Sequence, residues 1–249
     1  AYYVTRYVNN DETQIHVDNT YRQQEMYFST SNVYEILSKW SVSMSYDFKW
    51  NKLNANMVDF AFPHRYSNFV SLATALTLSR IQAQASLVEQ VVKDHVKYGA
   101  SSSSRSTLTP AFFVNVYPFE SKLLAVRAFA KKSFRMPTFN DLYYADMGNS
   151  KLNPESALQY DLGFVLNKDW KQGIVDHLRL QVDGYYNTVY DKIVAYPKGQ
   201  QFRWTMLNLG KVHIKGVDAM AEVGLEPAKD WKVTARLQYT YQDARDVTD

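Results

Sequence analysis

Four polar or aromatic side chains lie close together in the sequence at the point where one strand pattern ends. Arg135 is followed by Asp141, Tyr143 and Tyr144. A guanidinium can bind carboxylate, phosphate or catecholate oxygens through two hydrogen bonds. A tyrosine can stack on a planar ligand while its hydroxyl donates a hydrogen bond. These residues are therefore candidates for binding a small molecule. The sequence equally allows Arg135 to pair with Asp141 or a backbone carbonyl and so to hold the loop.

Histidine offers one further candidate, His64, which falls in a long predicted loop where it could face a ligand. A lone loop histidine is more often a solvated side chain. The chain has no cysteine, its five histidines are scattered, and its acidic residues are not grouped at the spacing of metal ligands. No serine and histidine form a nucleophile elbow. We therefore expect no metal site, no cofactor and no enzymatic activity.

Composition narrows the class of protein. A net charge of +3 over 249 residues does not indicate a nucleic-acid surface. No run of about 18 apolar residues could form a transmembrane helix, and the first residues lack the basic and apolar segments of a signal peptide. The mean hydropathy of -0.39 is that of a soluble protein. Strands that alternate between lipid and water average to similar values, so a β-barrel stays possible.

The dominant pattern is alternation with a period of two, which places successive side chains on opposite faces of a strand. In residues 41–50 the large apolar and aromatic side chains have even numbers, and the serines, Asp47 and Lys49 have odd numbers. Residues 86–97 could form a short helix, which we interpret as the continuation of a strand. Alternation predicts strands at 41–50, 69–79, 81–88, 123–134, 157–167, 178–187, 216–226 and 231–242.

Short and long connections alternate along the chain. The short ones are expected near 38–39, 79–80, 120–122, 167–169 and 227–230, and the long ones near 51–66, 98–105, 135–154 and 188–204. This arrangement is typical of an antiparallel up-and-down meander with tight turns on one rim and long loops on the other. We therefore predict an all-β fold of this kind.

Aromatic residues favour a membrane setting for this sheet. Trp40, Trp170 and Trp231 each lie just after a short turn, and in two of these strands a second aromatic cluster follows about eight to ten residues later. At about 3.3 Å per residue and a tilt near 40°, that separation spans roughly 25 Å. It fits the two aromatic girdles of an outer-membrane barrel. The alternative is that these rings fill the core of a soluble sheet.

Several phrases in the second half of the chain resemble those of TonB-dependent outer-membrane receptors. Members of that family commonly carry FR-x-P-T-x-x-(E/D)-L-Y, then G-N-x-x-L-x-P-E, then a strand ending in (D/E)-L-G, and later N-x-G-x-x-x-x-(K/R)-G-(V/I/F)-(E/D). The chain has FRMPTFNDLY, GNSKLNPE, DLG and NLGKVHIKGVD at 134–143, 148–155, 161–163 and 208–218. The resemblance covers roughly residues 105–249, whereas residues 1–104 fit by pattern only.

The resemblance implies that the meander is part of a 22-stranded transmembrane β-barrel in the cell outer membrane. It implies TonB-dependent uptake of a scarce nutrient such as an iron-siderophore or a similar chelate, haem, cobalamin or a glycan. The expected partners are this small ligand, the lipid bilayer, and TonB through a plug domain. About a dozen strands can be counted, without a plug or a closing C-terminal strand, so we interpret residues 1–249 as a partial barrel. Its unpaired edges would favour association.

Two other readings of the pattern stay open from the sequence. A passive porin or an autotransporter barrel shares the alternation and the girdles, but should lack the quoted phrases. A soluble binding or adhesion module could also be built on a large antiparallel sheet. The predicted lumen-facing charges are expected to form wall or plug contacts, and they are Arg127, Lys131, Arg179 and Asp183.

Overall fold

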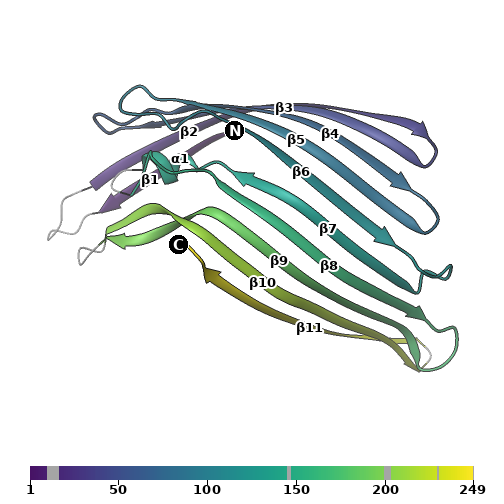
Figure 1. The fold of residues 1–249 in the computed structure, drawn as a ribbon. Coiled ribbons are helices and arrows are strands. Elements are labelled where there is room, and N and C mark those ends of the chain that lie inside the picture. Colours follow the sequence, from purple (N-terminus) through teal and green to yellow (C-terminus); the bar gives the residue numbers. More distant parts are fainter. Residues whose placement is uncertain (10–16, 145–146, 199–202, 229, 249) are drawn as a thin grey trace.

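The computed structural model describes residues 1–9, 17–144, 147–198, 203–228 and 230–248. Within these ranges, eleven strands form one curved antiparallel sheet in sequence order, which confirms the predicted meander (Figure 1). The elements are β1 (Tyr2–Asn9), β2 (Val17–Leu37), β3 (Trp40–Ala55), β4 (His64–Thr77), β5 (Ile81–His95), β6 (Arg105–Val116), β7 (Leu124–Arg135), α1 (Phe139–Tyr143), β8 (Glu155–Asp169), β9 (Val175–Lys198), β10 (Arg203–Ala228) and β11 (Trp231–Asp246). No helix in the described ranges is long and apolar enough to cross a membrane.

One face of the sheet, here called the outer face, carries the large apolar side chains. The strand register places these side chains next to one another. Met44 pairs with Asn32 and with Leu72, and Leu72 pairs with Leu87 on the next strand. Direct antiparallel partners project to the same face. These side chains are exposed, with Met44 at 57%, Leu72 at 54% and Leu237 at 72%. The apolar face is therefore not the core of a packed sandwich of the described residues.

Aromatic residues mark both ends of the apolar part of β3. At the short-turn end, the Trp40 indole nitrogen donates a hydrogen bond of 2.7 Å to the Thr74 hydroxyl. At the long-loop end, Trp50 pairs with Tyr66 of β4. The separation of ten residue steps between these tryptophans corresponds to about 25 Å of tilted strand, which is the height of the apolar band of an outer-membrane barrel.

The opposite face, here called the inner face, is polar. Arg127 donates two hydrogen bonds to the Asp183 carboxylate, of 2.7 Å and 2.5 Å. Gly163 lies directly between them in the register of β7, β8 and β9. A Cβ at Gly163 would come within 2.8 Å of both Asp183 Cγ and the Val182 carbonyl oxygen. Because Gly163 of the Asp-Leu-Gly phrase has no side chain, the ion pair between Arg127 on β7 and Asp183 on β9 can pass over β8 at this position. Lys131 and Arg179 share this face by alternation, as predicted.

The predicted long connection at 188–204 is wrong. Strand β9 continues to Lys198, and β10 pairs with it from Arg203, for example Leu207 with Val194. β-Branched and aromatic side chains on both strands extend the hairpin beyond the membrane-spanning part. Asp191 and Lys192 interrupt the apolar alternation there, which made the segment look like a loop. Residues 199–202 lie outside the described ranges.

Smaller differences concern where strands end. The loop expected at 51–66 is confined to 56–63, because β3 reaches Ala55 and β4 begins at His64. The turn expected at 167–169 belongs to β8, and 227–228 belong to β10, while Lys229 lies outside the described residues. The segment 86–97, interpreted as a strand rather than a helix, is within β5 as far as His95. Polar residues at strand ends paired with neighbouring strands explain these extensions.

Candidate functional site

The described parts of the loop between β7 and β8, residues 136–144 and 147–154, fold onto the inner face at the long-loop rim. Its helix α1 begins with a capping box: the Asp141 amide donates to the Thr138 hydroxyl at 3.2 Å, and the Thr138 amide donates to the Asp141 carboxylate at 2.8 Å. Phe139, Leu142 and Tyr143, at the i, i+3 and i+4 positions, are buried together. The helix is therefore attached by one apolar face, although it has only five residues.

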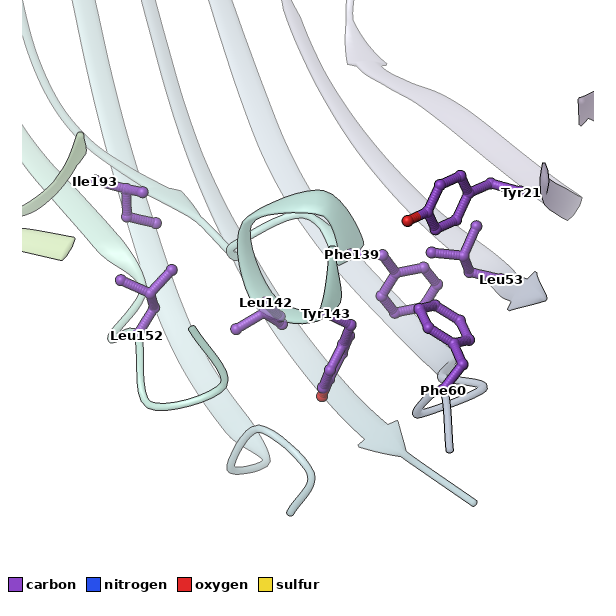
Figure 2. Packing of buried hydrophobic residues seen from close by; sticks show 8 residues of the cluster. All are labelled: Tyr21, Leu53, Phe60, Phe139, Leu142, Tyr143, Leu152 and Ile193. Carbon is purple, nitrogen blue, oxygen red and sulfur yellow. The ribbon is translucent and has the colours of Figure 1, made fainter. Parts of the chain in front are cut away.

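A compact apolar cluster holds this helix against the sheet (Figure 2). It combines residues from the loop with residues from strands that are far apart in the sequence. Leu142 is 2% exposed and Leu53 of β3 is 3% exposed. The members of the cluster are Tyr21, Leu53, Phe60, Phe139, Leu142, Tyr143, Leu152 and Ile193. Burial of this kind stabilises by about 1.5–3 kcal/mol for each large side chain, so the loop is fixed rather than free.

A buried ion pair anchors the beginning of the loop. Arg65 donates to both carboxylate oxygens of Asp94, at 2.6 Å and 2.7 Å, and its remaining Nη1 donates to the Pro137 carbonyl at 2.7 Å. Its guanidinium lies 5.1 Å from the centre of the Phe139 ring. The Asp94 side chain is 0% exposed and that of Arg65 is 11% exposed. Neither residue was selected from the sequence, although opposite charges at inner-face positions near the ends of adjacent strands were a usable signal.

Arg135 and Asp141 lie close together, which agrees with the alternative that Arg135 pairs with Asp141 and holds the loop. Arg135 Nε donates to Glu155 at 2.6 Å, and its Nη1 lies 3.4 Å from the Asp141 carboxylate. The other oxygen of Glu155 accepts a hydrogen bond of 2.6 Å from the Ile193 amide. Arg135 thus joins the end of β7 to the start of β8 and to α1 through its Nε and Nη1.

The Gly-Asn phrase closes the same loop. The Gly148 amide donates to the Tyr144 carbonyl and the Asn149 amide to the Asp141 carbonyl, both at 2.8 Å. The Asn149 side chain donates to the Met206 carbonyl of β10 at 3.0 Å. A Cβ at Gly148 would lie 2.7 Å from the Tyr144 nitrogen, so only glycine fits. The first two of the four phrases that carry the family resemblance are therefore parts of one packed structure.

Tyr143, the last residue of α1, and Tyr144, which follows it, have different surroundings. The Tyr143 hydroxyl accepts a hydrogen bond of 3.0 Å from the Ser102 amide in the loop between β5 and β6. Burial raises the pKa of the Tyr143 hydroxyl, against a smaller lowering by the Ser102 amide, so the phenol stays neutral. The Tyr144 ring instead stacks on Tyr21, with centroids 4.7 Å apart and planes at 20°. Tyr143 links two loops, and Tyr144 remains available at a cavity.

This cavity has a volume of about 410 Å³ and lies on the inner face beside α1. Its walls bring Asp141 and Tyr144 together with residues of β1, β2 and β10 that were not selected from the sequence. They include Tyr3, Tyr21, Gln23 and Met206. Tyr3 and Tyr21 are found here because odd-numbered positions of β1 and β2 face inward in the observed register. Stacked rings with a carboxylate and amides at the margin can hold a flat, partly polar small molecule.

His64 is not part of this assembly. It is the first residue of β4 and pairs with Lys52 of β3 and His95 of β5 on the outer face, not in a loop above the lumen. Its ring lies 6.1 Å from that of Trp50. Across the residues that the structure describes, no three His, Cys, Asp or Glu side chains are placed to hold a metal ion.

Residues 1–249 match the family described as TonB dependent receptor-like, beta-barrel. The chain belongs to this family. The match includes residues 1–104, where the sequence shows alternation without family phrases. It separates this TonB-dependent receptor chain from the alternatives of a porin and of a soluble module. The receptor chain is an outer-membrane protein.

Curated relatives of this receptor chain include the vitamin B12 transporter BtuB of Vibrio vulnificus (strain YJ016). The two are 28% identical over 118 residues, which are 47% of this chain and 17% of the relative. The similarity therefore spans less than a fifth of that transporter.

Solved structures show the same fold. The copper transporter OprC gives a TM-score of 0.72 at 16% identity, covering 91% of this chain and 38% of that one. The FrpB iron transporter from Neisseria meningitidis gives a TM-score of 0.68 at 14% identity, covering 93% of this chain and 37% of that one. The eleven-stranded sheet thus corresponds to a part of a longer TonB-dependent receptor barrel.

Proposed function

We propose that this chain supplies part of the wall and the ligand-binding rim of a receptor for TonB-dependent nutrient uptake. The proposed ligand is a small metal chelate, an iron-siderophore or a compound of similar size such as cobalamin. Energy coupling would pass through TonB and a plug domain, as the family resemblance implies. The proposal includes no catalytic step.

The observation that carries this proposal is the inner-face cavity beside α1. It opens where the long loops meet, and its aromatic rings come from three separate parts of the chain: Tyr3, Tyr21 and Tyr144. Rings of this kind stack on conjugated chelates, while Asp141 offers an acceptor at the edge. Arg135 lies behind Asp141 and keeps it oriented through the loop. Tyr143 and His64, also predicted from the sequence, lie outside this cavity: Tyr143 is buried and bonded to the Ser102 amide, and His64 faces away from the lumen. Neither is part of the proposed ligand site.

The relatives give the proposal its class of ligand. Their names assign vitamin B12, iron and copper as cargo. A hemophore receptor seen with haem has the same fold at 13% identity. The loop 136–154 contains no histidine between its two phrases, so haem is the weaker choice. Chelates bound by stacking and by hydrogen bonds to their margin fit the tyrosine-lined cavity better.

Substituting Tyr144 by alanine in the full-length receptor is expected to weaken ligand binding about tenfold. One stacked aromatic face is lost, and burial of such a ring is worth about 1.5 kcal/mol or more. Tyr3→Ala should behave similarly, because this exposed ring faces the same cavity. Binding is measured by fluorescence titration of detergent-purified receptor with a ferric catecholate chelate and, separately, with cyanocobalamin.

Tyr160→Ala serves as the matched control. Tyr160 is also an exposed strand tyrosine, at 51%, but it lies on the outer face in register with Tyr186. Its loss should leave binding of both probes unchanged. Equal affinity of wild type, Tyr144→Ala and Tyr3→Ala for a probe that the receptor binds would remove the cavity from the proposed site.

A further inference from the structure

The outer face carries a group of basic residues just beyond its aromatic row at the long-loop rim. Register places them side by side: Lys52 pairs with His64, which pairs with His95, and Lys93 pairs with Tyr66. Arg22 lies next along the same face, opposite Asn54. This group, here called the basic rim patch, comprises Arg22, Lys52, His64, Lys93, His95 and Lys97.

Part of the basic rim patch forms a shaped hollow. A depression of about 450 Å³ is lined by Lys52, His64, His95 and Lys97, with Asn54 at its margin and Phe62 and Val96 as apolar wall. Lys97 is held in place, because its amide donates to the Ala61 carbonyl at 2.8 Å. Its ammonium lies 5.6 Å from the Phe62 ring centre and 4.9 Å from that of Tyr98. The hollow therefore presents cations on fixed backbone rather than on a free tail.

Asp18 of β2 lies on the same face as Arg22, but both oxygens of its carboxylate accept hydrogen bonds from Arg6. Within the described ranges, no carboxylate forms an ion pair with Arg22, Lys52, Lys93 or Lys97. Asp94 is adjacent in sequence, but it faces inward and is bound to Arg65. The nearest outer-face acid along β5 is Glu89, four residues below Lys93, where it accepts a hydrogen bond from Ser106. An uncompensated group of cations attracts an anion.

Position decides which anion this is. The basic rim patch points away from the lumen, so nutrient in the cavity beside α1 does not reach it. It lies directly beyond Trp50 and Tyr66, whose amphipathic rings mark the boundary between hydrocarbon and headgroups. A side chain one residue pair above that row is at the depth of the headgroups. Cations at this depth strengthen attachment to anionic lipid.

We propose that the basic rim patch is a binding site for the phosphate groups of an anionic lipid in the leaflet at the long-loop rim. Lys52 and Lys97 contact a phosphate in the hollow, and Arg22 and Lys93 contact neighbouring phosphates of the same or an adjacent lipid. The acyl chains lie against the apolar outer face below Trp50. The site is separate from the ligand cavity and does not depend on the proposed transport.

The test uses full-length receptor in detergent, with lipid retention read by native mass spectrometry. The probes are diphosphorylated lipid A, the same lipid A without phosphates, and inorganic phosphate as competitor. The triple variant Lys52→Gln/Lys93→Gln/Lys97→Gln should retain diphosphorylated lipid A at least tenfold more weakly than wild type. The triple variant Lys52→Arg/Lys93→Arg/Lys97→Arg should retain it like wild type. The charge-matched control, Lys39→Gln/Lys122→Gln/Lys171→Gln at the opposite rim, should also leave retention unchanged.

Four results would overturn the proposal. The first is equal retention of diphosphorylated lipid A by wild type and by the triple glutamine variant of the basic rim patch. The second is equal retention of lipid A with and without phosphates by wild type. The third is displacement of the lipid by millimolar inorganic phosphate, which would make the hollow a site for a soluble anion. Lys93 and Lys97 are exposed and Lys52 is half-buried near the end of β3, so all variants should fold. The fourth result is loss of lipid retention in the arginine variant.

Discussion

Arg65→Leu is expected to release the loop of residues 136–154 from the inner face. The substitution leaves the Asp94 carboxylate, which is 0% exposed, without its cation, and it removes the donor to the Pro137 carbonyl. Breaking a buried pair by removing one partner costs about 3–5 kcal/mol. This corresponds to a more than hundredfold shift in the docking equilibrium of the loop.

Hydrogen exchange followed by mass spectrometry measures this shift directly. In the full receptor, the amides of Leu142, Gly148 and Asn149, all hydrogen-bonded within the loop, should exchange at least a hundredfold faster in Arg65→Leu. Arg65→Leu/Asp94→Leu should recover most of the protection, because no unpaired charge stays buried.

Arg236→Leu is the control for this experiment. Arg236 is also paired with a carboxylate, Glu222, but its side chain is 58% exposed. Exposed pairs contribute about 0–1 kcal/mol, so exchange in the loop should not change. Wild-type exchange rates in Arg65→Leu would show that the ion pair does not hold the loop.

Gly163→Ala is expected to lower the stability of the barrel wall by about 2–3 kcal/mol. The new methyl group would come within 2.8 Å of Asp183 Cγ and of the Val182 carbonyl oxygen. Asp183 must then move away from Arg127, and overpacking of this degree costs about 1–3 kcal/mol before the loss of the ion pair is added. Denaturant unfolding of the receptor in lipid vesicles gives the change.

Two further variants separate the steric effect from a general preference for glycine. Gly184→Ala on the neighbouring strand should be nearly neutral, since its nearest contact would be the Leu162 carbonyl at 3.9 Å. In an Asp183→Ala background, Gly163→Ala should cost clearly less than in wild type, because the crowded carboxylate is gone. Additive effects of the two substitutions would contradict the explanation of the Asp-Leu-Gly phrase.

The sheet could be predicted from the sequence because one local property repeats along it. Alternation in 41–50 and 231–242 identifies both faces of a strand, and a one-residue slip would reverse them. The end of β9 could not be predicted in this way. Asp191 and Lys192 break the alternation, and only pairing with Leu209 and its neighbours on β10 shows that the strand continues.

The candidate site could be predicted only where it is local in sequence. The contact of Arg135 with Asp141 spans six residues and follows from the phrase that contains both. Arg65 and Asp94, by contrast, lie on separate strands. The hydrogen bond of Arg65 to the Pro137 carbonyl spans 72 residues of sequence. Tyr3 and Tyr21 reach the cavity through the register of β1 and β2. Long-range pairing of strands decides these contacts, and a single sequence does not contain that register.

Single-cysteine labelling tests most directly whether hydrocarbon covers the outer face of this sheet. The chain has no cysteine of its own, so Met44→Cys, Leu162→Cys and Leu237→Cys can be compared with the inner-face variants Ser45→Cys, Gln181→Cys and Gln238→Cys. A fluorophore on each is examined in the full receptor in bilayers. We predict that nitroxide lipids quench the fluorophore only at the first three positions. A water-soluble agent should quench it at the other three. Lipid quenching at the inner-face positions, or at neither set, would contradict the membrane assignment.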